Sequence, residues 1–217
     1  ASFLRLAEGE KIAAMICVKE FSESLHLAMA TKAADTVTIL RGVAPAKLNE
    51  PTLKFERLQW MRRTGNLEEA KTLLVGPTPD QNDTWWSERQ QVARDLLAAG
   101  RPADAYAVVV PHGQTRGIAF AEAEFLAGWI ALRHLRKNAD AQKHFQTLLD
   151  GAPTENSKSR AAYWLGRTYE AAGRRKEADD WYGRASKFGQ TFYGQLAARK
   201  MPGTAAQLPT DPIATDS

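Results

Sequence analysis

The sequence predicts an all-α fold in which helical hairpins stack into an α-superhelix, or solenoid. Apolar residues recur at helical spacing, turn residues return at a nearly constant interval, and β-branched runs are scarce. The composition agrees with this fold class. A chain of 217 residues with 44% hydrophobic residues is long enough and apolar enough to bury a large core.

The clearest hairpin is predicted between residues 160 and 187. Gly173 lies where the first helix must end, and a residue without a Cβ adopts the left-handed conformation of a helix terminus without strain. Gly166 lies inside that helix, so we expect it to allow close approach of a neighbouring helix. The small and aromatic positions fit the tetratricopeptide spacing: Gly166, Tyr169, Ala178, Tyr182 and Ala185.

The same pattern recurs three more times, which separates a repeat protein from an isolated hairpin. A turn residue is followed five positions later by alanine, and the turn residues are 35, 36 and 37 positions apart. The pairs are Gly65 and Ala70, Gly100 and Ala105, Arg136 and Ala141, and Gly173 and Ala178. Each hairpin can bury its apolar face only against its neighbours, so we expect irregular, tetratricopeptide-like units that stack.

The predicted superhelical domain covers residues 1–200, with partial or degenerate repeats at 1–50 and four hairpins and a terminal helix at 51–200. Residues 106–110 form a β-branched run, but they lie where a second repeat helix is due, so we interpret them as helix. Residues 201–217 contain three prolines among small and polar residues, which is typical of a linker or tail. The chain enters the pattern in mid-unit, so we expect further sequence on both sides.

Charge and cysteine content narrow the classes of partner. The net charge is +4 with a pI near 9.2, and the basic excess lies towards the C-terminus. This excess indicates either a solvated helix face or attraction to an anionic polymer such as a cell-wall glycan with carboxylate-bearing peptides. Acidic residues interrupt the basic ones, which disfavours nucleic acid. No apolar run approaches the roughly 20 residues of a membrane span, and the lone Cys17 forms no internal disulfide.

No catalytic or metal-binding motif is present in the sequence. There is no HExxH, no CxxC and no nucleophile elbow, so we predict no metal, no cofactor and no catalytic residue. Glu122 and Glu124 lie two positions apart on a predicted helix and point to different sides, so we interpret them as structural or solvated. The histidines lack ligand spacing: His26, His112, His134 and His144.

The six tryptophans are the remaining candidates for binding. Adjacent Trp85 and Trp86 cannot share one helix face, so we expect one in the core and the other exposed or packed on a neighbouring element. Core packing is the default for the other four. A tryptophan exposed in the hollow of a superhelix could stack on sugar rings.

Four stretches, at residues 85–113, 121–135, 160–174 and 191–199, resemble the helical region of the soluble lytic transglycosylases of α-proteobacterial type. AEAEFLAGWIALR and TFYGQLAA are the most specific parts, since generic tetratricopeptide repeats do not require them. The resemblance implies a periplasmic protein with a superhelix, which can close into a ring. A lysozyme-like domain then follows and cleaves the β-1,4 bond between N-acetylmuramic acid and N-acetylglucosamine, leaving a 1,6-anhydro product.

The catalytic part of that family has no counterpart in this chain. Its acid is a Glu in a Glu-Ser dipeptide followed by a Gly-Leu-Met-Gln-Leu-like stretch, and Glu23-Ser24 has no such run after it. The resemblance therefore implies a non-catalytic scaffold whose partners are the glycan strand and a downstream catalytic domain. The candidate glycan or docking surface is Trp85, Trp86, Arg160, Trp164, Phe192 and Tyr193. An adaptor that binds a peptide or protein, and an enzyme with an unrecognised site, are the alternatives.

Overall fold

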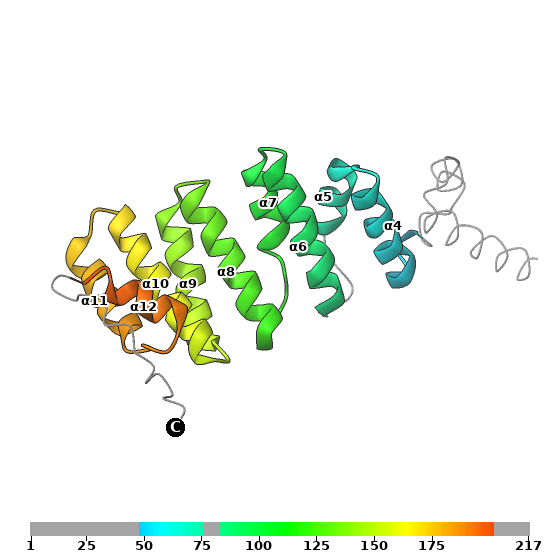
Figure 1. Ribbon diagram of the computed structural model, residues 1–217. Coiled ribbons are helices and arrows are strands. Elements are labelled where there is room, and N and C mark those ends of the chain that lie inside the picture. Colours follow the sequence, from blue (N-terminus) through cyan, green and yellow to red (C-terminus); the bar gives the residue numbers. More distant parts are fainter. Residues whose placement is uncertain (1–47, 76–82, 202–217) are drawn as a thin grey trace, which may run out of the picture. The chain divides into compact units, whose positions relative to one another are not determined.

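The chain is described by a computed structural model at residues 48–75 and 83–201 (Figure 1). Every regular element in these two ranges is an α-helix, and neither range contains a strand. The all-α prediction is therefore confirmed. The chain divides into two compact units, residues 1–80 and 81–217, which are described separately below.

The described part of the first unit is one helical hairpin. It consists of α4 (Pro51–Arg63) and α5 (Leu67–Val75), which contact each other across a short turn at Gly65. Leu58, Ala70 and Leu74 are fully buried, so the two helices bring their apolar faces together.

The second unit contains three hairpins and a terminal helix. The first helix of each hairpin contacts the second, and successive hairpins contact each other through α7 and α8 and through α9 and α10 (Figure 1). The terminal helix α12 packs on α10 and α11. The elements are α6 (Asp83–Ala98), α7 (Pro102–Val109), α8 (Gly117–Arg133), α9 (Asn138–Gly151), α10 (Glu155–Ala171), α11 (Arg175–Ser186) and α12 (Phe192–Ala198).

All four turn residues of the sequence pattern lie in the left-handed region. Their φ angles are 78° at Gly65, 72° at Gly100, 54° at Arg136 and 75° at Gly173. At the three glycine turns, the residue after the glycine donates its N–H to the carbonyl five residues earlier, which satisfies an otherwise orphaned carbonyl of the helix end. The predicted hairpin turns are therefore confirmed.

The alanine five residues after each turn is a packing residue. Ala70, Ala105, Ala141 and Ala178 each have 0% of their surface exposed. A larger side chain at these positions would meet the first helix of the hairpin, because close-packed interiors leave no spare volume. The sequence interval therefore reports both where the chain turns and where the second helix touches the first.

Helix–helix contact also explains the glycine within α10. A Cβ added to Gly166 would lie 2.6 Å from Cε1 of Tyr182, so the ring of α11 occupies the place that a side chain would take. Gly128 of α8 has the same relation to Phe145 of α9, at 2.7 Å. The expectation that Gly166 permits close approach is confirmed.

Two further expectations are resolved within the described residues. The β-branched run is helical as interpreted, since α7 continues to Val109 and buries Val108 and Val109. The TFYGQLAA stretch forms α12, and the hydroxyl of Thr191 caps it by accepting the N–H of Gly194 at 3.0 Å. The predicted repeats at 1–50 and the tail at 201–217 lie almost entirely outside the described residues.

Replacing Gly166 with alanine tests the α10–α11 contact. Because the new methyl group would overlap Tyr182, we expect Gly166→Ala to lower the free energy of unfolding by about 1–3 kcal/mol. Gly183→Ala is the matched control, since its Cβ would meet only Met201 Cε at 3.7 Å, and we expect a gain of up to about 1 kcal/mol. Urea unfolding followed by circular dichroism measures both, and equal effects would contradict the packing argument.

Candidate functional site

Four of the six predicted site residues lie on two helices that pack together. Arg160 and Trp164 are one turn apart on α10, and Phe192 and Tyr193 begin α12. We call these four residues the α10–α12 surface. The Tyr193 ring lies 5.5 Å from that of Tyr163 on α10 and 5.2 Å from that of Phe192. Residues 30 positions apart in the sequence are thus brought side by side.

Arg160 is a half-buried cation held by α8. Its Nη2 donates to the carbonyl of Ala121 at 3.2 Å, and its Cζ lies 4.3 Å from the centroid of the Phe125 ring. Burial lowers the pKa of the Arg160 guanidinium, an effect that nearby Tyr193 and Glu122 oppose. Its Nε has no hydrogen-bond partner within the described structure. Arg160 is therefore a cation held in a fixed position against α8.

The aromatic residues of this surface differ in what they can contact. The ring of Trp164 is surrounded by Phe125 at 5.8 Å, Phe145 at 5.9 Å and the Arg167 guanidinium at 5.8 Å. It therefore serves packing. Phe192, in contrast, is 65% exposed and presents a free ring face beside Tyr193.

Trp85 and Trp86 are both buried, with 5% and 3% of their surfaces exposed. The indole N–H of Trp86 donates to Glu122 Oε2 of α8 at 3.2 Å, and its ring meets His112 edge-on at a centroid distance of 6.2 Å. This contact with α8 agrees with the expectation that one tryptophan of the pair packs on a neighbouring element. Neither indole can be reached by a sugar ring, so we leave both out of the candidate surface.

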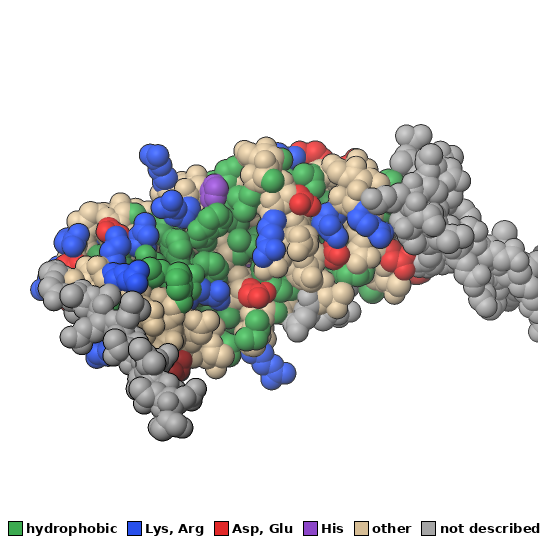
Figure 2. Space-filling view, in the orientation of Figure 1, with side chains coloured by type: hydrophobic (Ala, Val, Ile, Leu, Met, Phe, Trp, Pro, Cys, Tyr) green, Lys and Arg blue, Asp and Glu red, His purple; other side chains and the backbone are tan. Residues whose placement is uncertain are grey.

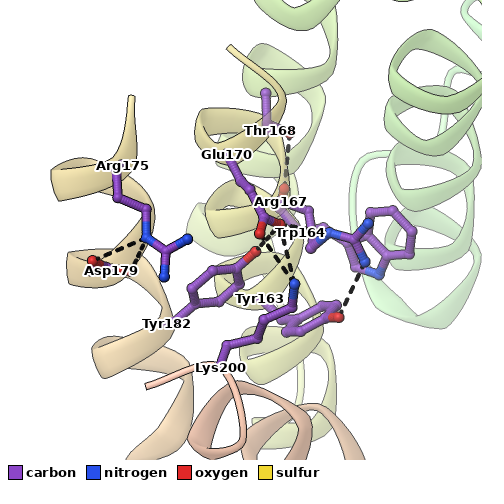
Figure 3. A network of polar contacts seen from close by, with 9 residues as sticks. All are labelled: Tyr163, Trp164, Arg167, Thr168, Glu170, Arg175, Asp179, Tyr182 and Lys200. Atoms are coloured by element: carbon purple, nitrogen blue, oxygen red, sulfur yellow. Dashed lines mark hydrogen bonds and ion pairs between the residues drawn. The ribbon is translucent and has the colours of Figure 1, made fainter. Parts of the chain in front are cut away.

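A polar network fixes the position of α12 (Figure 3). Glu170 of α10 accepts hydrogen bonds from the Tyr182 hydroxyl at 2.7 Å and from Lys200 Nζ at 3.1 Å, and it pairs with Arg167 Nε at 3.1 Å. Although burial alone would raise the pKa of Glu170, the contacts from Tyr182, Lys200 and Arg167 lower it below its usual value. Lys200 follows α12 directly, so this ionised carboxylate ties the end of α12 to α10.

Glu124 forms the centre of a second, buried network. Its Oε1 lies 3.2 Å from His112 Nε2 and its Oε2 lies 2.7 Å from His144 Nδ1. The backbone N–H of Gln114 donates to His112 Nδ1 at 3.0 Å, so in this arrangement the proton is on Nε2 and donates to Glu124. The Tyr106 hydroxyl lies 3.0 Å from His144 Nε2. The network thus joins α7, the loop after it, α8 and α9.

The order Tyr106, His144, Glu124 resembles a nucleophile, base and orienting acid, but its electrostatics disfavour catalysis. Burial and the nearby Asp140 and Glu124 raise the pKa of the Tyr106 hydroxyl, the opposite of what an activated nucleophile needs. Burial alone would also raise the pKa of Glu124, yet the hydrogen bonds from both histidines outweigh it and lower that pKa to about 2. The hydrogen bonds of the cluster link α7, α8 and α9.

Sequence reasoning missed this cluster. His112 and His144 lie 12 and 20 positions from Glu124, and no local spacing links them to it. Within residues 48–75 and 83–201, no three His, Cys, Asp or Glu side chains are grouped so that they could hold a metal ion. In the same ranges, no helix combines the length and apolar character needed to span a membrane.

Comparison of the chain with protein-family models, curated proteins and solved structures gives no match.

The Glu124 network predicts a specific loss of stability in acid. The pKa of Glu124 is about 2 in the folded state against an ordinary value of 4.5, so its contribution is complete above about pH 4.5 and disappears as the pH falls towards 2. A difference of this size corresponds to about 3 kcal/mol. We expect urea unfolding at pH 7, 5, 4 and 3 to show that the free energy of unfolding falls more steeply with decreasing pH in the wild type than in Glu124→Gln.

A second variant separates this effect from the loss of any carboxylate. Glu155 is exposed at the start of α10. The free energy of unfolding of Glu155→Gln should therefore fall between pH 5 and pH 3 as much as that of the wild type. If Glu124→Gln also retained it, the carboxylate between the two histidines would not be the group responsible.

Proposed function

We propose that this chain is the non-catalytic helical scaffold of a periplasmic lytic transglycosylase, in which the hairpins form a superhelix that holds the peptidoglycan glycan strand. A catalytic domain of the same protein, downstream of this region, would supply the chemistry. The proposal assigns no catalytic residue to the described helices.

The observation that carries the proposal is the packing of the aromatic start of α12 on α10, the helix that contains Arg160. TFYGQLAA, one of the two specific parts of the resemblance, forms this helix, and its Tyr193 ring lies 5.5 Å from that of Tyr163, three residues after Arg160. Helix packing accounts for the buried Gly194 and Ala197 and for the partly buried Tyr193 and Leu196, but not for the exposed Phe192. The exposed Phe192 and the adjoining Tyr193 and Arg160 therefore support a contact surface.

The physical role of such a surface is positioning. A guanidinium donates to carboxylate and hydroxyl oxygens of a glycan strand and its peptides, and an exposed aromatic ring covers an apolar sugar face. Holding the strand beside a linked catalytic domain raises its effective concentration there. The same surface would lie close to the site where that domain docks.

An adaptor that binds a peptide or protein is the second candidate. Figure 2 shows hydrophobic side chains gathered over α8 to α10 and bordered by Lys and Arg side chains. The partly buried hydrophobic residues of this region include Phe125, Leu149 and Trp164. A partner protein whose binding face is apolar at its centre and carries Asp and Glu at its edge would complement this surface.

Co-sedimentation with purified murein sacculi tests the proposal. We expect the 217-residue chain to bind sacculi, and the double variant Arg160→Ala with Tyr193→Ala to bind about tenfold more weakly, since roughly 1.4 kcal/mol corresponds to a factor of ten. Arg94→Ala with Arg133→Ala removes two exposed cations elsewhere in the second unit and should bind like the wild type. Circular dichroism checks that all variants fold.

Three outcomes would overturn this function. Equal binding by both double variants would show that the α10–α12 surface does not contribute to glycan binding. Retention of a peptide or protein with no affinity for sacculi would identify an adaptor. Release of muropeptides by this chain alone would show an intrinsic enzyme.

A further inference from the structure

The hairpin of the first unit encloses a hollow of about 460 Å³ that is separate from the α10–α12 surface. Its walls come from the two helices: Asn49, Lys54, Arg57 and Met61 on the α4 side, and Glu68, Glu69, Thr72 and Leu73 on the α5 side. A volume of this size falls within the range of small-ligand sites. The lining combines apolar and charged groups, as such sites do.

The charges in this hollow are separated along its length. α4 and α5 are joined by a three-residue turn and run antiparallel, so the start of α5 lies near the end of α4. Lys54 and Arg57 belong to the first half of α4, whereas Glu68 and Glu69 belong to the first turn of α5. One end of the hollow is therefore basic and the other acidic, and Met61 and Leu73 add apolar lining.

Arg57 has donor capacity that the protein does not use. Its Nη1 donates to the carbonyl of Leu48 at 3.0 Å, which holds the side chain in place, while its buried Nε has no partner in the described structure. Burial lowers the pKa of the Arg57 guanidinium. Lys54 lies one turn away on the same helix face. An oxyanion at this end of the hollow would be attracted by both cations.

The acidic end offers the complementary charge. Glu68 pairs with Lys71 at 3.0 Å, and the exposed Glu69 lies beside it at the rim. With a rise of about 1.5 Å per residue, the seven positions from Lys54 to Met61 span about 10 Å along the hollow. A ligand that uses both ends must carry a negative and a positive group on the order of 10 Å apart.

We propose that the α4–α5 hollow binds a short zwitterionic peptide of about three residues. Three extended residues span about 10 Å, which places the terminal carboxylate at Lys54 and Arg57 and the terminal ammonium at Glu69. Small apolar side chains of the peptide would contact Met61 and Leu73. The proposal rests only on the first unit and is independent of glycan binding by the second.

Titration of the full chain with trialanine by isothermal calorimetry tests this site. We expect saturable binding of trialanine and at least tenfold weaker binding of N-acetyl-trialanine amide, which has the same length and neither charge. Lys54→Gln and Glu69→Gln should each weaken trialanine binding by roughly two- to fivefold, as expected for partly exposed ion pairs. Arg63→Gln changes an exposed cation of α4 outside the hollow and should have no effect.

Singly capped peptides test the orientation. Trialanine amide keeps only the ammonium, so its binding should be insensitive to Lys54→Gln. N-acetyl-trialanine keeps only the carboxylate, so its binding should be insensitive to Glu69→Gln. Absence of trialanine binding, equal binding of the doubly capped peptide, or unchanged affinity in both charge variants would overturn the proposal. Each of these results is independent of the outcome with sacculi.

Discussion

The structure depends on small residues at the places where paired helices touch. Within each hairpin the second helix places a fully buried alanine against the first, and at two crossings an aromatic ring fills the space above a glycine. Gly166 beneath Tyr182 and Gly128 beneath Phe145 are equivalent contacts in successive hairpins. A short helical hairpin has little core of its own, so close approach of its two helices is what allows dispersion contacts to accumulate. The left-handed turns follow from this, since a tight turn is needed to bring the second helix back onto the first.

This constraint explains why the hairpins could be predicted from the sequence. The turn residue and the alanine are five positions apart in all four pairs. The first must adopt a left-handed backbone and the second must be small enough to be fully buried, so at the three glycine turns the residue types themselves indicate both positions. The Arg136 turn shows that geometry, not residue type, is repeated, because arginine there adopts the same left-handed backbone as glycine elsewhere. The turn and its alanine recur at a nearly constant interval, so periodicity is enough to find these apolar hairpin contacts.

The polar interior could not be predicted in the same way. The partners of Glu124 come from the loop after α7 and from α9, the other helix of its hairpin, and no repeated spacing in the sequence marks either of them. Arg89 is a similar case: it is 1% exposed and donates to the carbonyl of Val108 on α7, and burial lowers its pKa to about 10. A charged residue on a helix is ordinarily solvated. Burial of Arg89 or Glu124 therefore becomes apparent only once the partner helix is in place.

The arrangement of the C-terminal basic residues bears on how the α10–α12 surface can recognise a ligand. Arg160, Arg167, Arg174 and Arg184 lie over the rings of Phe125, Trp164, Tyr169 and Trp181, at 4.3–5.8 Å from the ring centroids. Such pairs occur about once per 70–80 residues in proteins generally, so four in one short region is a dense cluster. A guanidinium that covers a ring prevents a sugar from stacking on that face, whereas the N–H groups in its plane remain able to donate to other acceptors. Recognition by this region would therefore depend on hydrogen bonds to carboxylate or hydroxyl oxygens, with Phe192 as the main exposed ring on the surface.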